Sequence, residues 1–168
     1  MPTYLRQNSE MVKGDELWLF ISTDNGTTFK PTCFATQHSL NRSMNTTTVS
    51  SKDHGSSSYI VPGEGSWTAS TEALMSITTT DNGAMAFTDM MDAFQTQSLV
   101  SVRFGKLSNY TGTGIVGVDG ASEWQLGYPY WEGQAYITSL QASGGHGDSA
   151  TFSIELSGVG QLQKKTQA

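Results

Sequence analysis

The sequence has few charged residues. Only 14% of its 168 residues are Asp, Glu, Lys or Arg, against roughly 25% in an average soluble domain. Serine and threonine are abundant instead, with 21 residues of each. A free monomer normally carries charge on its surface for solubility, whereas the core of a protein interface is depleted of charge. We therefore expect a protein that packs against copies of itself.

The charges that are present argue against tight binding to nucleic acid. Nine basic and 15 acidic residues give a net charge of −6, and the basic residues are scattered along the chain. A protein that grips DNA needs a basic stripe to displace counterions from the phosphates. An acidic lining that lets DNA slide past without sticking is compatible with this composition.

Cysteine is nearly absent, since Cys33 is the single one and no intrachain disulfide can form. It has no basic neighbour or helix start to activate it, so we predict a small buried residue. No segment approaches the ~20 apolar residues of a membrane span, and the N-terminus lacks the apolar stretch of a signal peptide. We expect no membrane insertion. We also expect no metal or other cofactor, because three isolated histidines lie in predicted loops: His38, His54 and His146.

A catalytic constellation is also lacking, and we predict that the protein is not an enzyme. Residues 112–117 match the pattern GxGxxG, but a dinucleotide site needs a buried strand before that pattern and a helix after it. Neither 107–110 nor 119–122 has that character, so a glycine-rich turn or bulge is favoured. Three carboxylates lie in glycine-rich segments and are predicted to be solvated: Asp119, Glu123 and Glu132.

The sequence does contain strict alternation of apolar and polar residues near its C-terminus. Alternation places side chains on opposite faces of a strand, and a glycine-rich turn at 143–148 precedes it. The apolar face carries Ala150, Phe152, Ile154 and Leu156. The polar face carries Ser149, Thr151, Ser153 and Glu155. An earlier segment, 66–77, repeats the pattern with a polar face of Ser66, Thr68, Ser70 and Glu72.

Further strands are predicted along the chain. Residues 15–22 are apolar on both faces and favour a covered strand, and the Asn-Gly turn after it predicts a hairpin with a return strand at about 27–36. Residues 42–58 are polar and predict a projecting, flexible loop, with at most a short strand at 46–50. A further strand is expected at 98–105.

One amphipathic helix is predicted, beginning near Asp81–Gly83. Its apolar residues follow the i, i+3, i+4, i+7 spacing of one helical face, which we expect to pack on the sheet: Phe87, Met90, Met91 and Phe94. Strands followed by one helix and then strands indicate a mainly β protein, a β-sandwich or barrel with one flanking α-helix. We divide the chain into an arm (1–14), a single domain (15–163) and a short tail (164–168).

A group of aromatic residues leaves a second functional class open. Exposed aromatic rings on a β-sandwich can stack on sugars, so a carbohydrate-binding module is the alternative to a core or a subunit interface. The residues concerned are Trp124, Tyr128, Tyr130, Trp131 and Tyr136.

The order of these elements and several motifs resemble one known family. The motifs are LWLFIS, SSKDHG, GSWTASTEALMS, SVRFG and WEGQAYITSLQASGGHGDSATFSIELSGVGQL. They are similar to those of the major tail protein, or tail tube protein, of long-tailed bacteriophages. The resemblance covers most of residues 11–162 and is densest over 133–162. It implies a β-sandwich or half-barrel with one flanking helix.

The resemblance also implies a function. Such proteins form six-membered rings that stack into a hollow tube, which encloses a tape-measure protein and then conducts genomic DNA during ejection. Implied partners are other copies, the tape-measure protein, tail terminator and distal tail proteins, and DNA in transit. The implied location is the virion tail, assembled in the host cytoplasm. The same fold builds the tubes of contractile injection and secretion machines, which are a further alternative.

Two sets of residues receive expected roles on this basis. The N-terminal arm (1–14) and the projecting loop (42–58) are expected to reach the neighbouring ring. The residues concerned are Tyr4, Leu5, Arg6, Lys52, Asp53 and His54. The two polar strand faces named above, which lack Lys and Arg, are expected to line the lumen.

Overall fold

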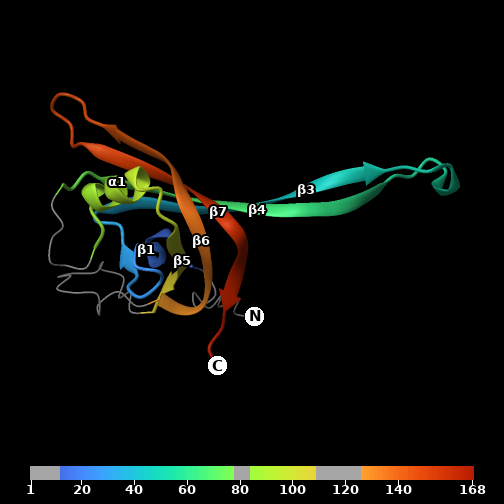
Figure 1. Ribbon diagram of the computed structural model, residues 1–168, viewed down its shortest axis with the longest axis horizontal. Helices are drawn as coiled ribbons and strands as arrows, with labels where there is room; N and C mark the ends of the chain where they lie inside the picture. The colour runs from blue at the N-terminus through green and yellow to red at the C-terminus, as the bar shows by residue number, and fades with distance from the viewer. Residues whose placement is uncertain (1–11, 78–83, 109–125) are drawn as a thin grey trace, which may run out of the picture.

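Alternating strands dominate the computed structural model, which describes residues 12–77, 84–108 and 126–168 (Figure 1). Seven strands form one sheet in the order β2-β1-β5-β6-β7-β4-β3, and each named pair is antiparallel. The strands are β1 (Leu17–Ser22), β2 (Lys30–Pro31), β3 (Ala35–Val49), β4 (Tyr59–Leu74), β5 (Val100–Leu107), β6 (Leu126–Ser143) and β7 (Thr151–Lys165). The described helices are α1 (Phe87–Gln95) and two 3-10 turns, Gly14–Glu16 and Lys52–His54.

The sheet curls over one hydrophobic core. Apolar side chains of β1 and β5, such as Leu19 and Val102, join those of β4 and β7, such as Ile154, in a single buried cluster. The ring of Trp18 on β1 lies 5.1 Å from the ring of His38 on β3, so strands far apart in the sheet order approach one another. This half-barrel with one described α-helix confirms the predicted fold class.

Trp67 fixes the place where β6 and β7 bend. Its indole is 3% exposed, and its Nε1 donates a hydrogen bond to the Gly160 carbonyl oxygen at 3.2 Å. A Cβ atom on Gly158 would lie 2.0 Å from the indole, and one on Gly133 would lie 2.6 Å from it. Both strand positions therefore require glycine because a large ring approaches the backbone. The β6–β7 register shifts beside Gly133, between Glu132 and Gln134.

Helix α1 closes one end of the core. The carboxylate of Asp89 accepts a hydrogen bond from the Ala86 N–H at 3.0 Å, which satisfies a donor at the helix start. Met90 is fully buried, and the ring of Phe87 meets the ring of Phe152 edge-on at 5.5 Å. This nine-residue helix is too short to cross a membrane, and no other described helix is long and apolar enough.

The predicted core face of the helix is wrong for Phe94. That side chain is 39% exposed, whereas Ala93 is buried and Met91 is half-buried. The buried stripe runs through Phe87, Met90 and Ala93, so Phe94 lies at its edge in the last turn. The small Ala93 side chain fits the contact side of this last turn, where sequence periodicity had favoured the larger ring.

The segments on either side of β2 differ from expectation. The predicted return strand at 27–36 shrinks to Lys30–Pro31, and Phe34 has a positive φ of 52°. The Asp24 carboxylate accepts hydrogen bonds from Ser22 Oγ at 2.5 Å and from the N–H groups of Thr27 and Thr28 at 3.1 and 2.9 Å. These bonds, the Ser22 hydroxyl first, lower the pKa of Asp24 to about 2. They build a wider turn than the expected two-residue hairpin.

The predicted loop at 42–58 is instead the outer part of a hairpin. Strand β3 continues to Val49, and β4 begins at Tyr59, so only residues 50–58 connect them. The threonines 46–48 pair with residues 60–62 across the hairpin, which projects beyond the rest of the sheet (Figure 1). We call residues 44–62 the arm hairpin, which is distinct from the N-terminal arm of residues 1–14. Low apolar content misled the prediction because this strand is exposed on both faces.

The prediction that His38 is a solvated loop residue is likewise wrong, because its segment is part of β3. Its Nδ1 lies 2.6 Å from the Thr71 hydroxyl oxygen, and its Nε2 is buried with no hydrogen-bond partner. Burial lowers the pKa of His38 to about 4. The neutral imidazole therefore belongs to the contact between β3 and Trp18 of β1. The predicted burial of Cys33 is confirmed, and burial raises the pKa of that thiol.

We predict that Gly158→Ala destabilises the fold by about 1 to 3 kcal/mol or more, because the new methyl group overlaps the Trp67 indole. Gly144→Ala is the matched control, since its Cβ would meet Ala150 at an ordinary 3.6 Å. Urea unfolding of both variants measures the effect. Equal midpoints for the two variants would contradict the role given to Trp67.

The free energy of unfolding should also decrease as the pH is lowered, because of His38. The folded pKa of about 4 is below the unfolded value of 6.5, so this contribution is complete above pH 6.5 and is lost as the pH falls towards 4. Between pH 7 and 4.5 the loss should be about 2 to 3 kcal/mol. His38→Leu should remove that part of the pH dependence. Unfolding curves at both pH values decide, and parallel losses in the two proteins would contradict this assignment.

Candidate assembly surface

One face of the sheet is polar across four strands, β3, β4, β7 and β6. Residues paired across an antiparallel ladder point to the same side, so the register defines this polar face. On β3 and β4 it carries Gln37, Ser39, Asn41, Ser43, Ser66, Thr68, Ser70 and Glu72. On β7 and β6 it carries Thr151, Ser153, Glu155, Ser157, Ser139, Gln141 and Ser143. The same register also places two larger side chains on this face, Leu74 as the partner of Thr151 and Tyr136 as the partner of Ser157. Two of these residues are charged, and both are acidic.

Hydroxyl groups on the polar face bond to one another. The Oγ atoms of Ser39 and Ser70 lie 2.6 Å apart, and those of Ser43 and Ser66 lie 2.9 Å apart. The opposite side of the same strands carries buried residues, including Trp67 and Ile154. The sheet therefore has one dry face that forms the core and one wet face that offers neutral hydrogen-bonding groups to its surroundings.

The structure brings together the two polar strand faces predicted from the sequence. Ser70 pairs with Glu155 and Glu72 with Ser153, so β4 and β7 present their polar residues side by side. Ser149 is the exception, since it lies in the turn before β7. Of the residues expected in ring contacts, Lys52 and Asp53 are exposed at the tip of the arm hairpin. His54 ends the same 3-10 turn, and Tyr4, Leu5 and Arg6 lie outside the described residues.

Among the residues that the structure describes, the four-stranded part of the sheet has a free backbone edge on each side. Strand β3 is last in the order and pairs only with β4. Strand β6 pairs with β5 only as far as Ala135, so its residues 136–143 pair on one side, with β7. Unpaired N–H and C=O groups at an edge are a template for another strand. Sequence reasoning missed these two edges because they depend on long-range pairing.

The two free edges are compatible with each other. Neighbours in the order β6-β7-β4-β3 are all antiparallel, so β6 and β3 run in opposite directions. A second copy in the same orientation can place its β6 edge against β3 of the first and continue the antiparallel alternation. The arrangement therefore favours head-to-tail addition of copies, with a different surface used on each side.

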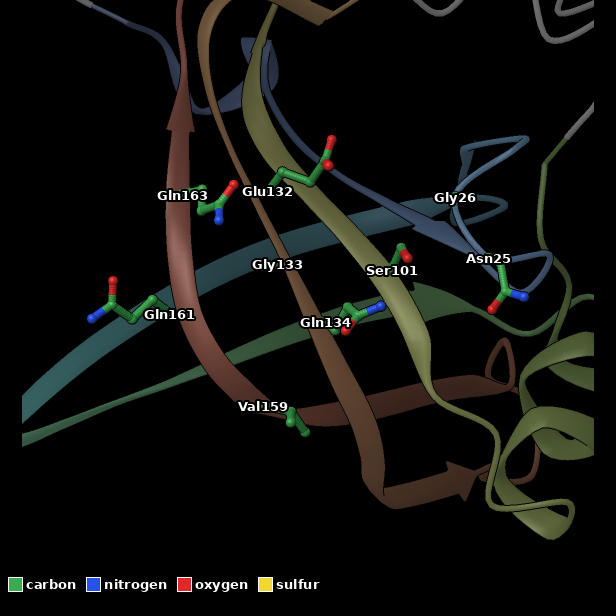
Figure 2. Close-up of a pocket in the computed structure, with 9 residues that line it drawn as sticks. All are labelled: Asn25, Gly26, Ser101, Glu132, Gly133, Gln134, Val159, Gln161 and Gln163. Atoms are coloured by element: carbon green, nitrogen blue, oxygen red, sulfur yellow. The ribbon is translucent and has the colours of Figure 1, made fainter.

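A polar hollow of about 450 Å³ lies beside the bend of β7 (Figure 2). Figure 2 shows Gln161 and Gln163 of β7 with Gln134 and Glu132 of β6 around it, and Asn25 of the β1–β2 turn. The Glu132 carboxylate is paired with Arg103 at 2.6 Å. Four of the nine lining residues carry side-chain amides. No cluster of three metal-binding side chains occurs in the described part of the chain. This hollow offers hydrogen bonds rather than reactive groups.

The described members of the aromatic group considered for sugar binding do not all share one surface. Trp131 packs against the hydrophobic core, and the Arg103 guanidinium lies 5.1 Å from the Tyr130 ring centre. Tyr128 stacks obliquely on Tyr130 at 5.3 Å, while Tyr136 lies further along β6, past the end of β5. Trp124, Asp119, Glu123 and the GxGxxG match at 112–117 lie outside the described residues.

Several solved structures with this fold come from tails and contractile injection systems. The chain aligns with a protein in the tail of an empty gene transfer agent particle, with a TM-score of 0.68, 16% identity and coverage of 94% of this chain and 100% of that one. The match to the SPP1 tail tube has a TM-score of 0.64 and 12% identity, and it covers 94% of this chain and 80% of that one. The match to the sheath–tube complex of an extracellular contractile injection system has a TM-score of 0.60 and 14% identity, and it covers 94% of this chain and 93% of that one. No curated protein matches the sequence.

The likeness to these structures shows the fold, since the identities are low. Membership rests on the family model described as phage tail tube protein, which matches residues 11–164. It confirms the family indicated by the sequence motifs and the structural role that they imply. The chain belongs to the phage tail tube protein family and is a structural component of a phage tail.

Proposed function

We propose that copies of this chain join edge to edge into closed six-membered rings that stack into a tube. The observation that carries the proposal is the pair of free edges on β3 and on residues 136–143 of β6, which lie on opposite sides of the four-stranded part of the sheet and run in opposite directions. Head-to-tail contacts of this kind generate a ring when the rotation between copies closes. Six copies are supported by the C6 symmetry of the related gene transfer agent tail.

The polar face is proposed to line the lumen. It turns hydroxyl and amide groups inward and carries two carboxylates, Glu72 and Glu155, in each copy. Six copies with two carboxylates give about 12 negative charges per ring, which repel DNA phosphates without holding them. Such a wall suits a conduit that first encloses a tape-measure protein and then passes genomic DNA during ejection.

Further contacts are proposed between neighbouring rings and at the two ends of the tube. The N-terminal residues 1–14 and the tip of the arm hairpin, with Lys52, Asp53 and His54, are proposed to reach the neighbouring ring. Tail terminator and distal tail proteins would cover the two ends, as a cap and a baseplate occur in the related anti-feeding prophage. Assembly would take place in the host cytoplasm. Residues 15–163 would act as one domain in each subunit.

Purified protein should self-assemble. Low surface charge and two compatible sheet edges favour association as the concentration rises. Negative-stain microscopy should show rings or tubes, and light scattering should rise with protein concentration. A protein that stays a monodisperse monomer at millimolar concentration and in several salts would rule out the proposed ring.

Replacing both Glu72 and Glu155 with Lys should leave assembly intact and make the tube retain DNA. The change adds about 12 positive charges per ring along the DNA path, and counterion release then favours binding, most at low salt. Co-sedimentation of assembled tubes with DNA at two salt concentrations measures this.

Two control variants locate the effect. The Glu72→Gln and Glu155→Gln pair removes negative charge without adding positive charge, so it should retain much less DNA. Asp92→Lys adds a positive charge on the exposed side of α1, away from the polar face. If the double Lys variant fails to assemble while the Gln pair assembles, these side chains belong to a contact between subunits and not to the lumen.

A further inference from the structure

Arg42 is the one charged residue of β3, and it lies on the strand whose edge the proposed ring uses. It pairs with Trp67, so its side chain leaves the sheet on the dry face, yet it is exposed. Among the described residues it belongs to neither of the two ion pairs. Its guanidinium, with five N–H donors and a permanent positive charge, is therefore available to a group outside its own subunit.

A hollow of about 530 Å³ opens where α1 ends, beside the free edge of β6. We call it the helix-end hollow. Phe94, Gln95 and Gln97 line it from the helix end. Tyr136 and Ile137 line it from β6, where β5 has stopped pairing. The side chains of Phe94 and Tyr136 are 39 and 43% exposed, so aromatic surface is available at the hollow.

The helix-end hollow suits a cation on an apolar stem. Aligned peptide dipoles give the C-terminus of a helix a negative partial charge, and the last turn of α1 contains no basic residue to meet it. Exposed aromatic rings attract a guanidinium and can cover the methylene stem of an arginine. The amide oxygens of Gln95 and Gln97 can accept hydrogen bonds from its N–H groups.

The two faces of the sheet limit how β3 of one copy can pair with the free edge of β6 in the next. The polar face takes the odd-numbered residues 37–43 of β3 and residues 139, 141 and 143 of β6. Strand β3 pairs with β4 without a register shift from Gln37 to Met44. Placing Gln37 opposite Ser143 keeps polar residues beside polar ones. A slip of one residue would turn dry-face residues to the polar side, and a slip of two in either direction brings a register shift of β3 against the edge.

This register brings Arg42 to the helix-end hollow. From Gln37 opposite Ser143, the pairs continue in step until β6 shifts its register between Ile137 and Ser139. With that shift kept, Arg42 lies opposite Ile137, which lines the hollow. Both residues belong to the dry face, on which α1 packs. The long arginine side chain can therefore reach the end of the helix.

We propose that Arg42 of each subunit enters the helix-end hollow of the neighbouring subunit in the same ring, and that this contact sets the register between β3 and β6. The inference rests on the proposed function and names the residue that selects one pairing among those that the free edges allow. Backbone edges alone can pair in several registers, whereas one specific charged contact penalises the others. Each subunit supplies one Arg42 and one hollow, so the contact repeats around the ring.

Charge reversal tests the contact. Arg42→Glu places a negative charge at the negative end of α1, and Gln95→Arg places a second positive charge in the hollow. Each change alone should raise the concentration needed for assembly about tenfold or more. The two together restore a pair of opposite charges, so assembly should return to within about threefold of the parent. Sedimentation of assembled protein over a concentration series at low salt measures this.

The matched control combines Arg42→Glu with Gln161→Arg. Gln161 is an exposed glutamine like Gln95, but it lies on β7 beside the polar hollow at the bend. This variant carries the same net charge as the charge-swapped protein, and it should not recover assembly. Urea unfolding of unassembled subunits should give equal midpoints for all variants, because each replaced side chain is exposed.

Disulfide formation tests the register separately. In a Cys33→Ala background, Asn41→Cys and Ser139→Cys are combined, and assembled protein is oxidised under mild conditions. Residues opposite one another on paired strands lie within reach of a disulfide, so denaturing gels without reductant should show a ladder of linked oligomers up to the ring size. The control combines Gln37→Cys with Ser139→Cys, since an offset of four residues separates the cysteines by about 13 Å along the strands.

The outcomes separate this contact from the ring itself. Rings that form with no ladder, or with an equal ladder in the control, overturn the register. In the Arg42→Glu background, equal assembly with Gln95→Arg and with Gln161→Arg overturns the role of Arg42. Either result leaves the proposed function standing, whereas a parent protein that never assembles removes both. If the cysteine pair alone prevents assembly, the charge-swap result decides.

Discussion

The close contact of Trp67 with two strand glycines is the constraint on which the rest of this structure depends. Because the indole occupies the space next to Gly133 and Gly158, β6 and β7 cannot continue straight past it. They turn there. Residues 126–135 of β6 pair with β5 on the core side of the bend, whereas residues 151–157 of β7 pair with β4 on the other side. The bend therefore separates a closed half of the sheet from a four-stranded half with free edges.

The same constraint determines which surfaces remain for other molecules. Since β5 follows β6 only to Ala135, the rest of β6 is left with one unpaired side. Long unpaired edges are normally blunted by charge or proline because they invite aggregation. Here β3 carries Arg42 as its charged residue, and that side chain belongs to the face opposite the polar face. An edge that is hazardous in a monomer becomes a joint in the proposed ring.

Local patterns predicted the parts of the fold whose burial is decided locally. Alternation identified the facing polar residues of β4 and β7, and the spacing of Phe87 and Met90 identified the helix. Patterns failed for the outer part of β3, residues 44–49, because a strand segment exposed on both faces has no apolar period, and pairing with β4 is what orders it. His38, in the same strand, was also misplaced. Phe94 was misassigned because helical periodicity is too coarse to show which side chain of the last turn meets the sheet.

The low charge of the sequence takes on a specific meaning once these surfaces are placed. As the proposed wall of the lumen, the polar face needs hydroxyl and amide groups in place of Lys or Arg, since any cation there would hold a passing polyanion. The proposed joints between copies, at the edges of β3 and β6, use backbone N–H and C=O groups, which carry no net charge. Both demands remove charge, for opposite reasons: one surface must release what touches it, and the other must retain it. A subunit that performs both tasks has little surface left on which charge is useful.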